Sequence, residues 1–457
     1  MSAQKNHFFT TVTLLTSAFK GKALSRLCLT VSVAMGLSAC SQVTGEVQEP
    51  TELYAELYKD SAASENKTVT VLGLLPEESV ESFEKSLAPF EEKTGIDVVF
   101  ESAPNFNSLL RMRIASFYEP DIAILPQPGI MLDLVENGHL VPLTDFIDIH
   151  RLREAYPEAW LELGSVEGVP YGLWYRASAK SLVWYNPSAF ERKGYDIPRS
   201  WDELIALSDR IVADGGTPWC IGLESGEASG WPGTDWVEDI LLRTGGPEAY
   251  NQWITHQMPF NSPSVIKAFN EFGKFLKTPK YTKGGPQTAV STAFTDSVLG
   301  IFGESPDCYM HRQANFISAS FPEEAQPKVD YDVFLLPGID PKYGTPLLVA
   351  GDALVMFNQT PESEALMRYL ITPEPHEIWA GEGGFISAHK DVSLEAYSDV
   401  VTQNIAQMLA DADVVRFDGS DVMPGYIGTD LFWSGIIDFA EGQSAEEVTK
   451  SIENSWP

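Results

Sequence analysis

Hydrophobic residues recur along the chain with two alternating spacings from about residue 68 onward. A β-rich run, VTVLGLL (69–75), precedes a polar stretch in which Phe83, Leu87 and Phe90 recur at helical spacing until Gly95. The same order returns when IDVVFES is followed by NSLLRMRIASF, and when DIAILPQPG is followed by IMLDLVENG. This alternation predicts βαβ units and a largely parallel sheet.

The second half of the chain repeats the pattern less regularly. SWDELIALSDRIVADGG predicts a helix that begins with a capping box of Ser200 and Glu203. YDVFLLPG and TPLLVAGDALVMF have the composition of strands, and TPESEALMRYLI predicts a helix with Pro361 in its first turn. Because 457 residues exceed one ordinary core, we expect two α/β lobes; the pattern leaves open how often the chain crosses between them.

The N-terminus has the features of a processing signal. Lys20, Lys22 and Arg26 precede LCLTVSVAMGL, an apolar run too short to span a membrane, which ends in LSAC at Cys40. This resembles the bacterial lipoprotein signal, and it predicts a signal peptide (1–39), lipid on Cys40 and a flexible tether (40–66). Plain secretion with cleavage near Ala39 is the alternative.

The charge of the chain excludes one class of partner. The net charge is -33, and beyond residue 39 the chain carries 27 basic against 64 acidic residues, or -37. Such a surface repels nucleic acid and anionic membrane lipid. It suits a neutral or cationic ligand, and it is compatible with a saline organism that imports compatible solutes.

The four cysteines are informative once export is assumed. Cys28 leaves with the signal and Cys40 takes the lipid, so that Cys220 and Cys308 remain in an oxidising compartment and favour a disulfide. Two separate buried thiols are the alternative. No CxxC or Cys/His spacing indicates a metal, and we expect neither a metal nor a cofactor.

An ordered set of segments carries a resemblance to a known family. LAPFEEKTGIDVVFES, PDIAILPQPG and ENGHLVPL come first, and KSLVWYNPSAFERKGYDIPRSWDEL, GWPGTDWVEDILLRTGG, CYMHRQANF, LLVAGDALVMF, EGGFISAHK and DVMPGYIGTDLFW follow. Together they resemble the bacterial extracellular solute-binding proteins of sugar ABC importers, similar to maltose-binding protein. PQPG, GWPGTDW and FDGSD resemble the α-glucoside and glucosylglycerol branch.

The resemblance implies an α/β, two-lobe periplasmic-binding-protein fold with discontinuous lobes and a hinge. Lobe 1 would hold 66–173 and 330–372, and lobe 2 would hold 174–329 and 373–457. The resemblance also implies a non-catalytic monomer on the periplasmic or extracytoplasmic face, anchored by its lipid. It would close on a neutral monosaccharide, disaccharide or glucoside (glucosylglycerol, trehalose, sucrose or maltose) and deliver it to an ABC permease.

A sugar offers apolar C–H faces for aromatic rings and hydroxyls for fixed polar groups. The loop GWPGTDW supplies both kinds of group: Trp231 and Trp236 to stack, with a core position as the alternative for each, and Asp235 to accept from hydroxyls. Gln127 lies where related proteins place a polar sugar ligand, whereas nearby Asp121 orients local backbone or binds. Further candidates are Glu77, Glu78, Asn105, Phe106, Trp174, Tyr175, Lys180, His311, Gln313 and Asp352.

The run RFDGSDVMPGYIGTDLFW is the last candidate segment. Its glycines and charges suit neither a helix nor a buried strand, and we expect a loop that forms the lobe 2 wall of the cleft. Resemblance to the maltose-binding segment makes Trp433 the main stacking residue. Arg416 and Asp418 are read as a polar pair that reaches the ligand or braces the loop, and Asp421 as solvated or capping.

Paired carboxylates with aromatic residues also describe glycosidases, so a secreted glycoside-processing enzyme is the alternative function. The chain has no GxSxG, HExxH or P-loop motif. The lipid signal and the ordered family segments favour the sugar receptor.

Overall fold

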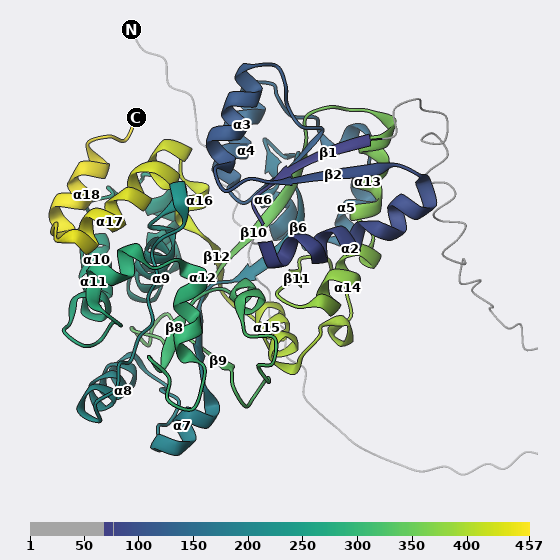
Figure 1. Ribbon diagram of the computed structural model, residues 1–457. Coiled ribbons are helices and arrows are strands. Elements are labelled where there is room, and N and C mark those ends of the chain that lie inside the picture. The colour runs from purple at the N-terminus through teal and green to yellow at the C-terminus, as the bar shows by residue number, and fades with distance from the viewer. Residues whose placement is uncertain (1–67, 76) are drawn as a thin grey trace, which may run out of the picture. The chain divides into compact units, whose positions relative to one another are not determined.

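The first strands of the chain form the parallel arrangement that the pattern predicts. The computed structural model describes residues 68–75 and 77–457, which belong to one compact unit (Figure 1). β1 (Thr68–Gly73) lies between β2 (Asp97–Ser102) and β3 (Ile122–Leu125), and both pairings are parallel. The helix between each pair of strands makes the crossover that a parallel pair requires.

The rest of this sheet is mixed, so the prediction of a largely parallel sheet is wrong for its second half. β10 (Leu347–Met356) is antiparallel to β3 and to β6 (Leu173–Ala179) but parallel to β12 (Val415–Phe417), and β11 (Ile386–Ser387) is antiparallel to β6. The resulting order is β11-β6-β10-β3-β1-β2, with β12 also beside β10. A crossover helix would make β10 parallel to the strand before it. The chain instead reaches β10 from the second sheet, so β10 can run antiparallel to β3 and β6.

Helices cover both faces of this seven-stranded sheet, and together they form lobe 1. Figure 1 shows α3 and α4 on one side of β1 and β2, and α2 and α14 on the other. Val69 and Val71 of β1 share a core with Phe83 and Phe90 of α2, whereas Leu72 packs with the helices of the opposite face. The elements of lobe 1 are α2 (Glu77–Thr94), α3 (Phe106–Ala115), α4 (Pro128–Glu136), α5 (Ile149–Ala155), α6 (Glu158–Leu163), β4 (Ser165–Val166), β5 (Val169–Pro170), α13 (Pro361–Leu370), α14 (Pro373–Glu382) and α15 (Val400–Ala410).

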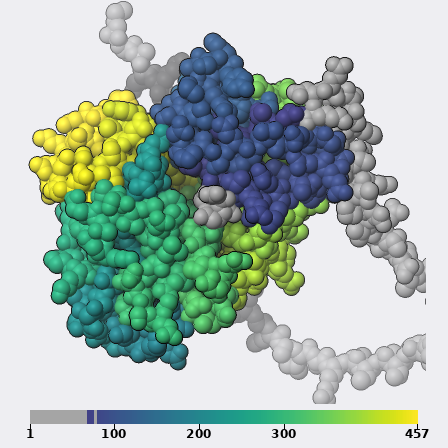
Figure 2. All heavy atoms as spheres, viewed as in Figure 1, coloured from purple at the N-terminus to yellow at the C-terminus, as the bar shows by residue number. Residues whose placement is uncertain are grey.

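Lobe 2 is built around a three-stranded antiparallel sheet. β7 (Leu182–Tyr185) lies between β8 (Met310–Arg312) and β9 (Asp332–Leu335). Figure 2 shows the C-terminal helices α17 and α18, in yellow, packed against the teal-green segment that holds α10 and α11. The helices of lobe 2 are α7 (Pro187–Lys193), α8 (Trp201–Ala213), α9 (Trp231–Ile254), α10 (Pro263–Lys277), α11 (Gly285–Ser291), α12 (Phe294–Ser297), α16 (Gly419–Val422), α17 (Trp433–Glu441) and α18 (Ala445–Glu453).

Short 3-10 and π turns complete the two lobes. They are η2 (Leu143–Asp145), η3 (Gly226–Ala228), η4 (Val298–Ile301), η5 (Asn315–Ser320), η6 (Leu394–Ala396) and the π-helix η7 (Tyr426–Phe432). The π-helix and α17 occupy the segment MPGYIGTDLFW, so the loop expected there is wrong. Gly425 has helical angles (φ -51°, ψ -41°), and a Cβ on Gly428 would lie 1.9 Å from the Ser420 carbonyl. The glycine at 428 therefore allows close backbone packing rather than a turn.

The sheet to which each strand belongs does not match the predicted lobe assignments of 330–372 to lobe 1 and 373–457 to lobe 2. β9 pairs with β7 in lobe 2, whereas β11 and β12 pair in the sheet of lobe 1. Within the described residues, the chain passes between the sheets at 180–181, between β9 and β10, and after β12. Three crossings interleave the lobes, which a boundary at residue 372 does not capture.

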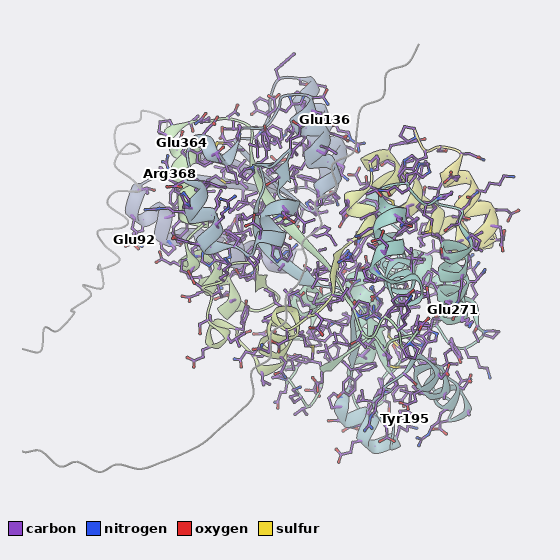
Figure 3. The ribbon with its side chains drawn as sticks, turned by 180° about the vertical axis from the view of Figure 1, so that it is seen from behind. Glu92, Glu136, Tyr195, Glu271, Glu364 and Arg368 are labelled. Carbon is purple, nitrogen blue, oxygen red and sulfur yellow. A yellow bond between two sulfur atoms is a disulfide. The ribbon has the colours of Figure 1, made fainter. Side chains whose placement is uncertain are left out.

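Helix ends follow the local sequence signals closely. Ser200 accepts from the backbone N–H of Glu203 (3.2 Å), but the Glu203 carboxylate accepts from Arg199 N–H (2.7 Å), so only half of the predicted capping box forms. Pro361 begins α13 as predicted. One turn apart on that helix, Arg368 donates to Glu364 (2.7 Å), and Figure 3 labels both side chains.

The predicted disulfide is confirmed: Cys220 is bonded to Cys308, with Cα atoms 5.5 Å apart. Both residues are buried, and a Cβ on Gly300 would lie within 2.8 Å of both sulfur atoms. The bridge ties the loop after α8 to the loop before β8 inside lobe 2.

Candidate functional site

A cavity of about 420 Å³ lies where the two lobes meet, within the usual range for small-molecule sites. Lobe 1 contributes the edge formed by β6, β10 and the loop that follows β3. Lobe 2 contributes the starts of α9, α12, α16 and α17. The lining residues are Leu74, Leu75, Pro104, Pro126, Gln127, Arg176, Ser178, Lys180, Ser225, Ala228, Trp231, Phe294, Thr295, Phe316, Ala350, Gly351, Asp352, Asp418, Asp421 and Trp433.

Strand periodicity explains which residues of β6 reach the cavity. Arg176, Ser178 and Lys180 line it at a spacing of two, while Tyr175 on the opposite face packs in the lobe 1 core. Opposite Arg176 on β10 lies Asp352, and the two side chains form a buried ion pair. The charge that interrupts apolar β10 is thereby matched by a partner, as its burial requires.

The crossing segments are hydrogen-bonded side by side at the base of the cavity. Lys180 N–H donates to the Leu348 carbonyl (2.8 Å), and Asp418 N–H donates to the carbonyl of Val349 (2.7 Å). Leu336 N–H donates to the carbonyl of Ser181 (2.8 Å). Because Lys180 and Asp418 lie on the crossings themselves, any rotation between the lobes acts directly on the residues of the cavity floor.

A network of buried charges lies beneath this floor. Lys180 Nζ donates to Asp235 Oδ1 (2.9 Å) and also to Asp418. Arg312 continues the network by donating to Asp235 (3.3 Å) and Asp239 (2.9 Å), and Asp239 accepts in turn from Arg243. Alternating charges of this kind keep fully buried groups partnered.

Burial and neighbouring charges give the carboxyl groups of the floor different pKa values. Burial raises the pKa of Asp235 to about 7, against the opposing effect of Lys180. Burial also acts to raise the pKa of Asp418, but the Lys180 charge and neighbouring hydrogen bonds outweigh it and lower that pKa to about 2. Asp418 is therefore the ionised partner of Lys180. Burial acts to lower the pKa of Lys180, but the charges of Asp235, Asp418 and Asp421 outweigh it and raise that pKa well above its usual value.

Three polar side chains that line the cavity, those of Asp421, Gln127 and Arg176, have atoms without a hydrogen-bond partner among the described residues. The Asp421 carboxylate accepts no hydrogen bond from residues 68–75 or 77–457, and burial followed by the nearby Asp418 raises its pKa well above its usual value. The Oε1 atom of Gln127 is buried and has no partner in the described part of the chain either. On the donor side, Arg176 has a buried Nη1 atom without a described partner. Polar atoms left in this state are what a hydroxylated ligand satisfies.

Aromatic rings form the apolar part of the cavity. The Trp231 ring lies 5.0 Å from Phe294 and 6.0 Å from Phe316, measured between centroids, and Lys180 Nζ lies 5.1 Å above it. Trp433 is buried and donates through Nε1 to Ser420 (3.4 Å). The wall therefore offers ring surfaces beside the polar floor, as C–H faces require.

Trp231 begins a helix, and the loop expected at GWPGTDW is wrong. Gly230 caps α9 with φ 110°, and a Cβ there would lie 2.0 Å from the Trp433 carbonyl. Only glycine combines this dihedral with such close backbone contact. The helix start and the C-terminal wall of the cavity are thereby fixed against each other.

Of the residues proposed as ligands from the sequence, six line the cavity: Gln127, Lys180, Trp231, Asp352, Asp418 and Trp433. Asp121 instead accepts from the backbone and hydroxyl of Thr70 (2.8 Å each), the local alternative. The side chains of Glu77 and Glu78, at the start of α2, lie outside the described residues.

Several candidates pack in the protein core and do not line the cavity. Trp236 stacks on Phe272 and Phe275, and Trp174 packs on Trp160 and Phe417. Phe106 is buried against Leu72 and Leu110, and Tyr175 bonds to Ser86 (3.2 Å). Asn105 occupies the N-cap position of α3 without a side-chain cap bond.

Polar candidates off the cavity have protein partners. His311 Nδ1 lies 2.9 Å from the Cys220 carbonyl oxygen, and burial lowers its pKa to about 4. Gln313 accepts from Ala314 N–H (2.8 Å), and Asp235 belongs to the buried network. Arg416 donates to Asn251 (2.8 Å), so the predicted Arg416–Asp418 pair does not form. Asp418 is drawn to Lys180 instead, since that cation lies on the neighbouring crossing.

The sequence reading missed several residues of the cavity. Arg176 and Ser178 follow from Lys180 by period two, a signal that was available. Asp421, expected to be solvated or capping, is buried at the cavity. Phe294 and Thr295 come from a segment that carries no motif, so no local signal marks them. Phe316 ends the family segment CYMHRQANF, from which only His311 and Gln313 were proposed.

Comparison with known proteins now adds to this geometry. The family model described as bacterial extracellular solute-binding protein matches residues 76–377, about two thirds of the chain. The chain is a bacterial extracellular solute-binding protein.

Relatives of this solute-binding protein match over most of its length. It is 48% identical over 393 residues to the osmoprotective compounds-binding protein GgtB of Synechocystis sp., covering 86% of this chain and 93% of that protein. It is 37% identical over 409 residues to the alpha-glucosides-binding periplasmic protein AglE of Rhizobium meliloti, covering 88% and 89%.

Solved structures share the fold. The bacterial solute receptor AcbH aligns with a TM-score of 0.73 at 20% identity, covering 85% of this chain and 98% of that one. Maltose-bound MalE3 of T. maritima aligns with a TM-score of 0.68 at 18% identity over the same shares. The predicted two-lobe fold is confirmed.

The predictions for the N-terminal segment are not tested by the described structure. The signal peptide, Cys40 and the tether lie outside the described residues. Among the described helices, none is both long and apolar enough to cross a membrane.

Proposed function

We propose that the protein captures a neutral α-glucoside, of the glucosylglycerol, trehalose, sucrose or maltose type, and delivers it to an ABC permease. One observation carries the proposal: the polar side chains of Gln127, Arg176 and Asp421 line the same cavity as the Trp231 and Trp433 rings. A polyhydroxylated ligand with apolar C–H faces meets both needs at once.

The charge of the cavity supports a neutral ligand. Arg176 is paired with Asp352 and Lys180 with Asp418, so neither cation is left to attract an anion. Asp421 adds a further carboxyl group to the wall. A phosphate or carboxylate on the ligand would meet repulsion from the ionised Asp418 and from the acidic chain as a whole.

The relatives support the same ligand class. The names of GgtB and AglE refer to osmoprotective compounds and to α-glucosides, and the alignments cover about nine tenths of each of these proteins. We extend this to a receptor held at the extracytoplasmic face by lipid on Cys40. The six cavity residues proposed from the sequence, with Arg176 and Asp421, form the ligand set of this proposal.

Titration calorimetry with glucosylglycerol, trehalose, sucrose, maltose and glucose tests the ligand class, with glucose 6-phosphate as the charged control. We expect micromolar or tighter binding of at least one α-glucoside and none of the phosphate. Absence of binding across the neutral panel, or preference for the phosphate, contradicts the proposal.

A glycoside-processing enzyme is the second candidate, and one observation favours it. Asp421, with a raised pKa, lies near ionised Asp418, and unequal carboxyl groups are the pattern of a glycosidase acid and its partner. Prolonged incubation with trehalose, sucrose and maltose decides between the two. Sustained glucose release, abolished in the Asp421→Asn variant, would establish the enzyme in place of the receptor.

A further inference from the structure

Glu227 of lobe 2 binds the first turn of a lobe 1 helix. Its Oε1 atom accepts from the backbone N–H of Asn107 (3.1 Å) and of Ser108 (3.4 Å), and its Oε2 atom accepts from the Ser108 hydroxyl (2.6 Å). These donors belong to the start of α3 in lobe 1. Glu227 lies on η3 in lobe 2, between Ser225 and Ala228 of the cavity wall.

The helix has no cap of its own. Asn105 holds the N-cap position of α3 but makes no side-chain cap bond, and the first turn contains no acidic residue. The first amide groups of a helix need an acceptor, and a carboxylate there is also favoured by the helix dipole. For α3 that acceptor comes from the other lobe.

A second contact shows that the two lobes meet closely on this side of the cavity. Gly129, near the start of α4 in lobe 1, packs against the Met423 and Asp421 carbonyls of lobe 2. The Glu227 contact therefore belongs to the closed arrangement. If the lobes opened, Glu227 and the α3 amide groups would separate, and each would form hydrogen bonds with water instead.

We propose that Glu227 is a latch: it retains the ligand by capping α3 across the lobe boundary, without touching the ligand. Glu227 does not line the cavity, whereas its neighbours do. The latch holds the 225–228 segment over the bound molecule and lengthens the time that the lobes stay closed. The latch proposal rests on the proposed function in one respect: a sugar is the ligand used to measure retention.

The test compares the Glu227→Ala and Glu227→Gln variants with wild type by stopped-flow sugar release and small-angle scattering. Removing a capping acceptor should raise the release rate and Kd about threefold to thirtyfold in Glu227→Ala. Glu227→Gln keeps a neutral acceptor oxygen, so its release rate should lie between the two. The association rate should not change, and ligand-free Glu227→Ala should scatter as a more open particle.

Glu446→Ala is the matched control, because Glu446 is exposed on α18 and has the same charge. It should behave as wild type in every measurement. Wild-type release from Glu227→Ala, or an effect of equal size in Glu446→Ala, overturns the latch. If wild type binds none of the neutral sugars, the proposed function fails, and the latch is then judged by ligand-free scattering alone. Equal radii of gyration for wild type and Glu227→Ala would reject it.

Discussion

The carbonyl oxygen of Met423 lies 2.3 Å from the point that a Cβ atom would occupy on Gly129. The two residues belong to different lobes, and their backbones approach as closely as glycine permits. Closure of the cavity on this side therefore depends on the absence of one methyl group.

The Gly129→Ala substitution should weaken sugar binding selectively. The methyl group clashes only when the lobes meet, and overpacking of about 1–3 kcal/mol corresponds to roughly a 5- to 100-fold rise in Kd. The ligand-free protein should be as stable as wild type or slightly more so, since alanine suits a helix better than glycine. Calorimetry and thermal melting measure the two effects. Gly381→Ala, a helical glycine whose Cβ would meet only ordinary contact, should show the same small gain in stability but leave Kd unchanged.

Trp231 and Trp236, five positions apart, should respond differently to truncation. Trp231 is half-buried at the cavity, so Trp231→Ala should lower affinity roughly 5- to 50-fold with little loss of stability. Trp236 is 2% exposed between Phe272 and Phe275, so Trp236→Ala should lower stability by about 3–5 kcal/mol. Urea unfolding and sugar titration separate the two results. Wild-type affinity in Trp231→Ala would remove that ring from the site.

Stability should depend on pH through Asp235. Its pKa is raised to about 7 in the folded chain from an ordinary value of 3.8, so the folded state holds the proton more tightly. The contribution of this group to stability is therefore full below about pH 4 and is lost as pH rises through 7. The buried histidines with lowered pKa act in the opposite direction, so the comparison must use a variant. Relative to wild type, Asp235→Asn should gain stability between pH 5 and pH 8, by up to a few kcal/mol on the order expected for such a shift. A constant difference between the two melting curves would contradict this.

Loss of the disulfide should affect stability and spare binding. The bridge joins residues 88 apart in sequence, for which chain entropy predicts about 4–5 kcal/mol. Neither cysteine lines the cavity. The Cys220→Ser/Cys308→Ser variant should therefore melt at lower temperature but bind sugar with unchanged Kd below its melting range. Wild type treated with reductant provides the matched comparison, and an equal loss of affinity in both would show that the bridge shapes the site.

Local sequence signals predicted the parts of the fold that local physics determines. The spacing of Phe83, Leu87 and Phe90 predicted α2, and all three are buried in the lobe 1 core. Cysteine number and export predicted the bridge. The lobe boundaries could not be read from such signals, because β9 and β11 join sheets through pairings distant in sequence.

The site shows the same division in a sharper form. Residue chemistry brought forward Gln127 and Trp433, which line the cavity, but also Trp236, whose identical indole packs in the core. A tryptophan has the same composition in either place, and only tertiary packing separates the two. Arg416 was assigned to Asp418 by proximity along the chain, whereas the cation that reaches Asp418 is Lys180, from another crossing.

The close backbone contact between Gly230 and Trp433 also determines when the cavity can form during synthesis of the chain. An emerging chain supplies the start of α9 well before the segment that must lie against it. The cavity can be completed only after nearly the whole polypeptide has been synthesised. A chain cut short before Trp433 would still have all seven strands of the lobe 1 sheet, yet it would lack one wall of its cavity, so partial products are poorly suited to compete for sugar.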